Sequence, residues 1–339
     1  MTAKQLPSHK DLINYNYAVA GHDGTLSDID GELFIKPCTR AEVEFYETSV
    51  ASYPNFAEIM PTFLGTLELG HQHNASAIEE QGGALISKHT IPEVVVPVTT
   101  KRITTNLAVV LENAAHGFVR PNILDVKLGV RLWADDALPE KKERFDKVTE
   151  ETTHKDLGFR IAGMRVWQGR RAIGKAGLDE EGYKIYDKNY GRFELDKHNV
   201  ADAFRNFIFN DPAGIDEELG RLVAQAFHSD LRRIQKVLEE QESRMFSASL
   251  LFVFEGDGVA LRAAMEEASR SPATLPNGDG DSDQSEDDDD LEQLTTPKIY
   301  TVKLIDFAHA FWTPGTGPDE NSLLGVRSVA NILESLGES

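Results

Sequence analysis

The spacing of apolar residues changes once along this chain, and that change limits the architectures it can adopt. In the first third, apolar residues come in short runs typical of strands, at Leu33–Lys36, Phe63–Thr66 and Leu107–Glu112. Between Ile215 and Ser247 they recur every three or four residues, a stripe that predicts a core-facing helix. Strands first and helices later predict an α+β fold of two lobes, with a cleft at the short connection near 112–117.

Local signals predict the other elements. Asn16–Ala20 and Leu33–Lys36 flank a Gly/Asp turn and suggest a hairpin. Thr39 is a capping residue ahead of helix formers that run to Ser49. Further helices are predicted over 139–151 and 323–336, and further strands over 94–96, 249–255 and 300–305.

Much of the negative charge is local. The chain has a net charge of −21, and residues 279–292 hold nine acidic residues and no basic one. Like charges at this density repel and cannot bury apolar surface, so residues 271–296 are predicted to be a disordered insertion. Two interpretations stay open for this acidic run: a solvated spacer, or a docking element for a basic partner such as a nuclear regulatory protein.

Charge and composition also exclude several classes of protein. A strongly acidic chain is unsuited to binding nucleic acid directly through its overall field. The sequence contains no apolar stretch long enough for a membrane span and no signal-peptide core at its start, so we expect a soluble, intracellular protein. Cys38 is the only cysteine, which excludes an intrachain disulfide and a cysteine metal cluster, and a buried structural thiol is expected.

Two positions suggest the chemistry of phosphoryl transfer, which needs cations on the phosphates and a carboxylate for magnesium. Asp306 follows the apolar run Val302–Ile305 and precedes Phe307, an arrangement that kinases use to hold magnesium. Lys36 ends a predicted strand and is followed by a helix that contains Glu42, as for a lysine that neutralises nucleotide phosphates. From the pattern alone, an exposed lysine at a strand end is an equal alternative.

The strongest local signal is Pro121–Gly129, with the sequence PNILDVKLG. If this segment is extended, Asp125 and Lys127 point to the same side. Together they could hold a hydroxyl and a phosphate. A surface salt bridge on a strand would give the same spacing, so both interpretations stay open here.

Basic residues gather in the region that follows. Lys141, Arg144 and Lys147 lie three apart on the helix predicted over 139–151, and residues 160–192 carry eight Lys or Arg against four Asp or Glu. A local basic pocket on an acidic chain favours a small, highly charged anion over long nucleic acid. A solvated helix face paired with neighbouring glutamates is the alternative for individual residues.

The segment PNILDVKLG resembles the PxxxDxKxG signature of the inositol polyphosphate kinases. Other blocks resemble that family in the same order and span nearly the whole chain: Ala20-Gly21-His22, Asp23-Gly24-Thr25, Glu42–Tyr46, Leu157–Met164, Tyr190-Gly191-Arg192, Ser249–Leu251 and Ile305–His309. Within the family, the AGHDGT opening and the acidic run before the IDFAH block are most similar to the fungal multikinases.

The resemblance implies a two-lobed fold distantly similar to protein kinases. It implies an N-terminal ATP-binding lobe over 1–112 and a C-terminal catalytic lobe over 113–339. The second lobe would include a small helical inositol-binding insert over 130–192, in addition to the acidic insertion. ATP and magnesium are the implied cofactors, and inositol polyphosphates are the implied substrates.

The resemblance also assigns residues to roles. It implies catalytic roles for Asp125, Lys127 and Asp306, with Asp306 as the magnesium ligand. The implied cofactor-binding residues are Lys36, Glu112 at the adenine-facing hinge, Asp125, Ser249 and Asp306. It implies substrate contacts for Lys127 and His309. The basic pattern of the following region adds further predicted substrate-binding residues: Lys141, Arg144, Lys147, Arg160 and Arg192. Where the family usually has a serine pair before Leu-Leu, this chain has Ala248-Ser249, which leaves one hydroxyl.

Several functions remain to be distinguished. The first is a multikinase that converts inositol trisphosphate and tetrakisphosphate to pentakisphosphate; the second is a narrower trisphosphate 3-kinase or a kinase that forms inositol pyrophosphates. A scaffold in a nuclear transcription-regulatory complex is the alternative of another class. A protein-substrate kinase is disfavoured because the HRD-type and GxGxxG loops are absent from the sequence. A nuclear and cytoplasmic location follows from the resemblance alone.

Overall fold

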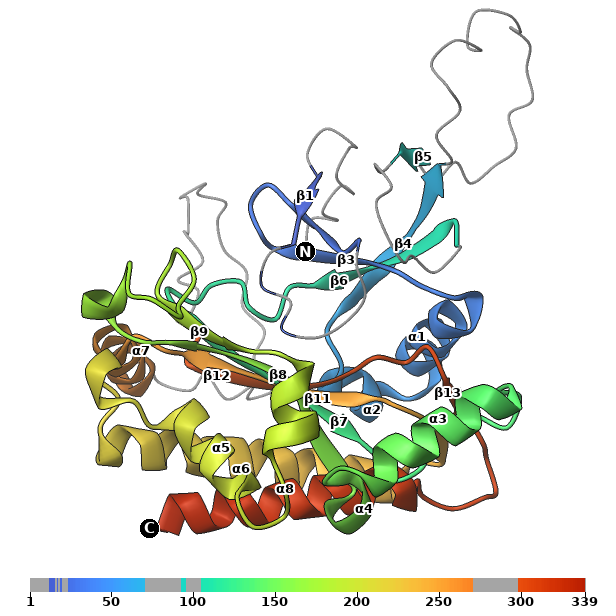
Figure 1. The fold of residues 1–339 in the computed structure, drawn as a ribbon. Helices are drawn as coiled ribbons and strands as arrows, with labels where there is room; N and C mark the ends of the chain where they lie inside the picture. Colours follow the sequence, from blue (N-terminus) through green and yellow to red (C-terminus); the bar gives the residue numbers. More distant parts are fainter. Residues whose placement is uncertain are drawn as a thin grey trace, which may run out of the picture.

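The computed structural model describes residues 12–15, 17, 19, 24–70, 93–95, 105–270 and 298–338. The predicted disordered insertion over 271–296 lies outside the described residues, as do residues 21–23 of the predicted hairpin turn. The described residues form two lobes, each with its own sheet (Figure 1). Within them, no helix combines the length and the apolar character needed to cross a membrane.

The N-terminal lobe is built on a six-stranded sheet of order β1-β2-β3-β6-β4-β5. Its strands are β1 (Leu12–Asn14), β2 (Leu26–Asp28), β3 (Leu33–Pro37), β4 (Phe63–Gly70), β5 (Glu93–Val95) and β6 (Leu107–Glu112). The predicted strands near 33, 63, 94 and 107 are therefore confirmed. The predicted strand over 16–20 is wrong at Tyr17 and Val19, which are not in a strand, and β3 pairs instead with β2.

Two short helices follow β3. Helix α1 (Arg40–Ser52) begins where predicted, because the Thr39 hydroxyl accepts a hydrogen bond from the Glu42 amide at 3.2 Å. Helix α2 (Pro54–Ile59) follows with a proline in its first turn. This start of α1 places Glu42 on the buried side of the helix, facing the end of β3. The cap thus fixes the position of Glu42, which belongs to the site described below.

The C-terminal lobe has a five-stranded antiparallel sheet of order β12-β11-β7-β8-β9. Its strands are β7 (Pro121–Leu128), β8 (Phe159–Trp167), β9 (Tyr183–Tyr186), β11 (Ser249–Glu255) and β12 (Tyr300–Ile305). One face meets the N-terminal lobe, and helices α5 (Val200–Ile208), α6 (Glu217–Glu240) and α8 (Glu320–Glu338) cover the other (Figure 1). Helix α7 (Gly258–Arg270) follows β11.

Most of the apolar stripe of the long helix is buried, as the sequence predicted, but Leu222 in that stripe is 42% exposed. The helix ends at Glu240, however, and the predicted extension to Ser247 is wrong. Residues Ser243–Met245 form strand β10, which pairs with β13 (Ala310–Trp312) beside the loop that carries Asp306. The positive φ of 62° at Ser247 is also incompatible with a helix that runs to that residue.

The segment over 130–192, predicted as a helical insert, is only partly helical. Helices α3 (Pro139–Glu150) and α4 (His154–Leu157) occupy its first part, and a π-helix (Tyr190–Glu194) closes it. Between them, β8 is buried along its whole length and pairs with β7 in the central sheet. The prediction of a helical insert is therefore wrong for Phe159–Trp167. These residues form β8, a buried strand of the lobe's central sheet.

An aromatic cluster joins the lobes behind the cleft. The buried ring of Phe307 lies 4.9 Å from that of Phe45, 5.2 Å from Tyr46 and 6.0 Å from Phe56, centroid to centroid. Phe307 follows β12 of the C-terminal lobe, whereas its three neighbours lie on α1 and α2. The residue after Asp306 therefore anchors the loop to the other lobe.

Replacing this anchor should destabilise the fold. We expect Phe307→Ala to lower the free energy of unfolding by about 3–5 kcal/mol, because a fully buried ring is lost and a cavity remains. Urea unfolding followed by circular dichroism measures the difference. Phe311→Ala is the matched control, since that ring is 44% exposed. Equal losses for the two variants would contradict the anchoring role of Phe307.

Candidate active site

A pocket lies between the lobes, with an apolar interior and a polar end. Tyr15, Tyr17, Phe34 and Leu111 line it from the N-terminal lobe, and Ile123, Leu251, Val253 and Ile305 line it from the C-terminal sheet. The polar end holds Lys36, Asp125 and Asp306. The hinge segment over 112–115 forms a further wall. A flat apolar group with a charged extension would match this division.

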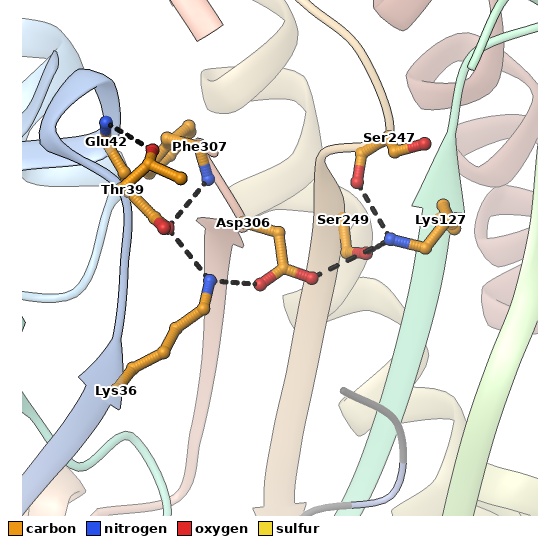
Figure 2. A network of polar contacts seen from close by, with 8 residues as sticks. All are labelled: Lys36, Thr39, Glu42, Lys127, Ser247, Ser249, Asp306 and Phe307. Atoms are coloured by element: carbon orange, nitrogen blue, oxygen red, sulfur yellow. Dashed lines mark hydrogen bonds and ion pairs between the residues drawn. The ribbon is translucent and has the colours of Figure 1, made fainter. Parts of the chain in front are cut away.

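Lys36 is held between two carboxylates. Its ammonium lies 2.8 Å from Glu42 Oε1 and 2.7 Å from Asp306 Oδ1 (Figure 2). Glu42 Oε1 also accepts a hydrogen bond from the Phe307 amide at 3.3 Å. Burial lowers the pKa of Lys36, but Asp306 and Glu42 raise it more, so the net direction is upward and the ammonium stays charged. The alternative of an exposed lysine is excluded, since Lys36 is 7% exposed.

Lys127 approaches the same carboxylate from the other side. Its ammonium donates to the Ser247 carbonyl at 2.8 Å and to the Ser249 hydroxyl at 3.3 Å, and it lies 3.7 Å from Asp306 Oδ2 (Figure 2). Each oxygen of Asp306 thus faces one lysine, from different lobes. Ser249, the one hydroxyl left from the family's serine pair, lies inside this cluster.

The backbone at Asp306 is in the left-handed region, with φ of +69°. A non-glycine residue in that region is uncommon and is usually held there by its surroundings. Here β12 precedes it and the anchored Phe307 follows it. The conformation directs the carboxylate into the cleft, where both lysines meet it.

Asp125 lies on β7 beside this cluster and is 4% exposed. Burial raises the pKa of its carboxyl to about 6; Asp306 adds to this, whereas Lys127 and the hydrogen bond from Ser249 oppose it. Within the described residues, its Oδ1 is buried and has no hydrogen-bond partner. A buried acceptor of this kind is ready for a hydroxyl from a bound molecule.

Asparagine at position 125 should stabilise the ligand-free protein. The pKa of Asp125 in the folded protein, about 6, lies above its ordinary value of 3.8, so protonation of this carboxyl favours the folded state. This stabilisation is complete below about pH 4 and is lost as the pH rises through 6. We expect Asp125→Asn to be more stable than the wild type by roughly 1–3 kcal/mol at neutral pH. Thermal unfolding in a chelator between pH 4 and pH 8 tests this. A variant less stable at pH 8 would contradict it.

The carboxylate of the hinge residue Glu112 forms its hydrogen bonds outside the polar cluster. Burial raises the pKa of this carboxyl, but hydrogen bonds from Thr62 at 2.8 Å and Lys298 at 3.1 Å outweigh burial, so the net direction is downward. Glu112 and its neighbours Asn113 and Ala114 line the pocket. Its predicted contact with adenine stays a prediction.

Apart from Lys127, the residues predicted to bind substrate lie in three places. Lys141 on α3 lies 3.1 Å from His309 Nε2, so these two predicted residues meet. Arg144 and Lys147 point outward, and Lys147 pairs with Glu151 at 3.7 Å. Steps of three residues rotate a helical position by about 60°, which turns the later two away. Arg160 and Arg192 lie elsewhere, on β8 and the π-helix.

A β-bulge controls which residues of β8 face the cleft. Lys127 is opposite Arg160, Asp125 is opposite Gly163, and the register shifts between these two pairs. Directly opposed residues share a face, so Arg160 stands on the side of Lys127. The extra residue on β8 shifts the alternation of its side chains by one. Arg165, which is opposite Ile123, therefore faces the cleft as well.

Arg165 is a residue that sequence reasoning missed. Its guanidinium lies 5.0 Å from the Tyr17 ring and 3.9 Å from the Tyr183 ring, and it pairs with Asp179 at 3.2 Å and Glu181 at 2.6 Å. It contacts Tyr17, which lines the pocket, and itself lines the adjoining hollow together with Asp179 and Glu181. The only signal was a second arginine in an otherwise apolar run, FRIAGMRVW.

Two lysines and one carboxylate can bind a polyphosphate together with a divalent cation. No group of three or more His, Cys, Asp or Glu side chains gathers as a metal site in the described ranges. A single carboxylate such as Asp306 suits Mg²⁺, which commonly takes one or two carboxylates and completes its shell with phosphate oxygens and water. The residues present therefore fit magnesium bound with a nucleotide.

Comparisons with known proteins agree with this chemistry. The family model described as inositol polyphosphate kinase matches residues 108–334. An inositol polyphosphate multikinase of Saccharomyces cerevisiae is 35% identical, over 95% of this chain and 99% of that protein. Inositol hexakisphosphate kinase 1 of Homo sapiens is 30% identical, over 67% of this chain and 52% of that protein.

A solved structure is similar as well. The inositol phosphate multikinase of S. cerevisiae, in complex with ADP and Mn²⁺, has a TM-score of 0.61 at 29% identity. The similarity covers 90% of this chain and 99% of that one. It therefore extends over both lobes.

Proposed function

This chain belongs to the inositol polyphosphate kinase family, and we propose that it acts as a multikinase, transferring the γ-phosphoryl group of ATP to hydroxyls of inositol trisphosphate and tetrakisphosphate to give pentakisphosphate. The observation that carries this proposal is the position of Asp306 between Lys36 and Lys127, with Asp125 buried beside them. Phosphoryl transfer is catalysed mainly by such positioning and charge.

The nucleotide would bind with its base in the apolar part of the pocket and its phosphates at the polar end. Lys36, fixed by Glu42, would neutralise the phosphates from the N-terminal lobe. Asp306 would hold Mg²⁺, which when bound neutralises charge on the β- and γ-phosphates. In the ligand-free protein Lys36 and Lys127 neutralise the Asp306 carboxylate, and this keeps it in place for the ion.

The acceptor would approach from the side of Lys127. Asp125 would accept a hydrogen bond from a hydroxyl through Oδ1. Lys127 would lie against the γ-phosphoryl group, which passes in line from ATP to the acceptor oxygen. The P–O bond to the acceptor forms as the P–O bond to the leaving ADP breaks, and the proton of the acceptor hydroxyl is released on the side of Asp125. No covalent enzyme intermediate is expected, because no nucleophile of the chain is needed between the two oxygens.

The multikinase assignment is supported by the extent of similarity. The fungal multikinase matches nearly the full length of both chains, whereas the hexakisphosphate kinase matches about half of its own length. The narrower activities, a trisphosphate 3-kinase or an inositol pyrophosphate-forming kinase, remain the runner-up because they share the PxxxDxKxG signature.

Product analysis tests the proposal. Purified protein is incubated with Mg-ATP and inositol 1,4,5-trisphosphate, and the products are resolved by anion-exchange chromatography. We expect tetrakisphosphate first and then pentakisphosphate. A single tetrakisphosphate that is not consumed would favour the narrower kinase, and the absence of any product would contradict the proposed activity.

Two expectations from the resemblance stay proposals: a nuclear and cytoplasmic location, and a docking role for the acidic run over 279–292. Deletion of that run tests the second. If the run docks a nuclear regulatory protein, deletion should abolish binding and leave catalysis unchanged. If the deletion variant still binds the partner with unchanged affinity, the acidic run is only a spacer.

A further inference from the structure

The segment PNILDVKLG ends in a glycine that has no part in the proposed chemistry. Gly129 directly follows β7, two residues after Lys127, and has a φ of +98°. A Cβ at this position would lie 2.5 Å from Nδ2 of Asn321. Any other residue here would strain the backbone and also collide with the Asn321 amide. The glycine therefore makes room for a residue of α8, which lies far along the chain.

The Asn321 side chain holds the backbone that leaves β7. Its Oδ1 accepts hydrogen bonds from the amides of Val130 and Arg131, both at 2.9 Å, and its Nδ2 donates to the Arg131 carbonyl at 3.0 Å. These bonds use both polar atoms of the side-chain amide, so they fix its orientation. The Val130 carbonyl also accepts a hydrogen bond from the Thr149 hydroxyl of α3, at 2.7 Å. The segment just after Lys127 is therefore fastened to two helices.

The start of α8 also fixes the segment that receives the Lys127 ammonium. Asp319 is 2% exposed, and its Oδ2 accepts a hydrogen bond from the Met245 amide at 2.9 Å. Two residues later, the Ser247 carbonyl accepts a hydrogen bond from Lys127 at 2.8 Å (Figure 2). In the part of the chain that the structure describes, Ser247 and Asp306 are the two non-glycine residues with a positive φ. Both contact the ammonium of Lys127.

The Ser247 hydroxyl joins the two segments to each other. It donates a hydrogen bond to the Leu132 carbonyl at 3.0 Å. A non-glycine residue keeps a positive φ only where its surroundings hold it there. The hydroxyl supplies one such contact, and the carbonyl of Ser247 is thereby directed at Lys127. Residues 129–132 and 245–248 thus form a frame around the ammonium, and α8 supports both sides of it.

We propose that Asn321 is a positioning residue for phosphoryl transfer and that it acts through Lys127. By fixing residues 129–132, which Ser247 links to 245–248, Asn321 keeps the ammonium directed at Asp306 before the inositol acceptor binds. A lysine side chain has many rotamers, and a displacement of about 1 Å in a catalytic site can lower the rate roughly 10²-fold. The inference rests on the proposed function and adds a residue of α8 to it.

A double-mutant cycle tests this coupling. Asn321→Ala, Lys127→Ala and the double variant are assayed with Mg-ATP and inositol 1,4,5-trisphosphate. We expect Asn321→Ala to lower kcat/KM for the trisphosphate roughly 10- to 100-fold, with KM for ATP unchanged. In the Lys127→Ala background the same substitution should lower it less than about threefold, because the residue that it positions is gone. Losses that multiply in the double variant would overturn the proposal, since Asn321 would then act independently of Lys127.

Two further variants separate positioning from a loss of stability. Ser247→Ala removes only the hydroxyl that contacts Leu132, and it should lower the same constant roughly 3- to 10-fold, again without further effect in the Lys127→Ala background. Asn210→Ala is the matched control, because Asn210 also donates a side-chain hydrogen bond to a backbone carbonyl, that of Trp167 at 2.7 Å, at the far end of β8. It should lower Tm and change no kinetic constant. An equal kinetic loss in Asn210→Ala would overturn the proposal.

Calorimetric titration with inositol 1,4,5-trisphosphate in the absence of ATP keeps the positioning role distinct from the proposed function. Transfer by the wild type, with unchanged kinetics in Asn321→Ala, would overturn the positioning role alone. Binding that Asn321→Ala and Lys127→Ala weaken without multiplying, in a protein that transfers no phosphoryl group, would overturn the proposed function and leave the positioning role supported.

Discussion

Asp306→Asn should lower kcat roughly 10³-fold or more, equivalent to about 4 kcal/mol of transition-state stabilisation. The substitution removes the negative charge that suits a magnesium ion and also breaks the contacts with Lys36 at 2.7 Å and Lys127 at 3.7 Å. Both lysines keep their charge, so nucleotide phosphates can still bind. We therefore expect the loss mainly in kcat, with a higher requirement for free Mg²⁺.

A steady-state assay over a range of magnesium concentrations measures both effects. The matched control is Asp202→Asn, which removes one carboxylate from the exposed face of α5 and should leave kcat unchanged. Turnover by Asp306→Asn near the wild-type rate, at any magnesium concentration, would refute its role as metal ligand.

Lys127→Ala has the second largest expected effect. Lys127 lies between the nucleotide end of the site and Arg160, and its ammonium contacts Ser247, Ser249 and Asp306. Its removal takes a cation from the transferred phosphate, so we expect kcat/KM for the inositol acceptor to fall roughly 10²- to 10³-fold. ATP affinity should change little, because Lys36 and Asp306 remain paired.

Separate titrations with nucleotide and with acceptor distinguish these effects. Lys184→Ala is the control, since Lys184 is exposed on β9, at the edge of the same sheet. A loss of ATP affinity with normal turnover of Lys127→Ala would contradict the assignment of Lys127 to the acceptor side.

The sequence was sufficient for the parts of the fold that depend on local pattern. Thr39 caps α1 through its own hydroxyl, and the stripe of α6 follows from helical spacing, so both could be predicted. Asp125 and Lys127 share a face because β7 is extended, which is a property of one strand. The family resemblance connected these local features to one cleft.

Features that depend on contacts distant in sequence could not be predicted. The bulge opposite Asp125 decides that Arg160, Gly163 and Arg165 face the cleft, and a bulge exists only between two paired strands. The early end of α6 depends on β10 pairing with β13, far along the chain. Likewise, nothing in the helical spacing of α3 indicates that Lys141 reaches His309 while Lys147 turns to Glu151.

The position of a bound divalent ion tests the central claim most directly, namely that transfer takes place at the cluster of Lys36, Asp306 and Lys127. Crystals of this protein grown with ADP and Mn²⁺ allow the metal to be located by anomalous scattering. We predict a peak about 2 Å from a carboxylate oxygen of Asp306, between that residue and the nucleotide phosphates. A nucleotide and metal bound elsewhere, with Asp306 still paired to both lysines, would contradict the account.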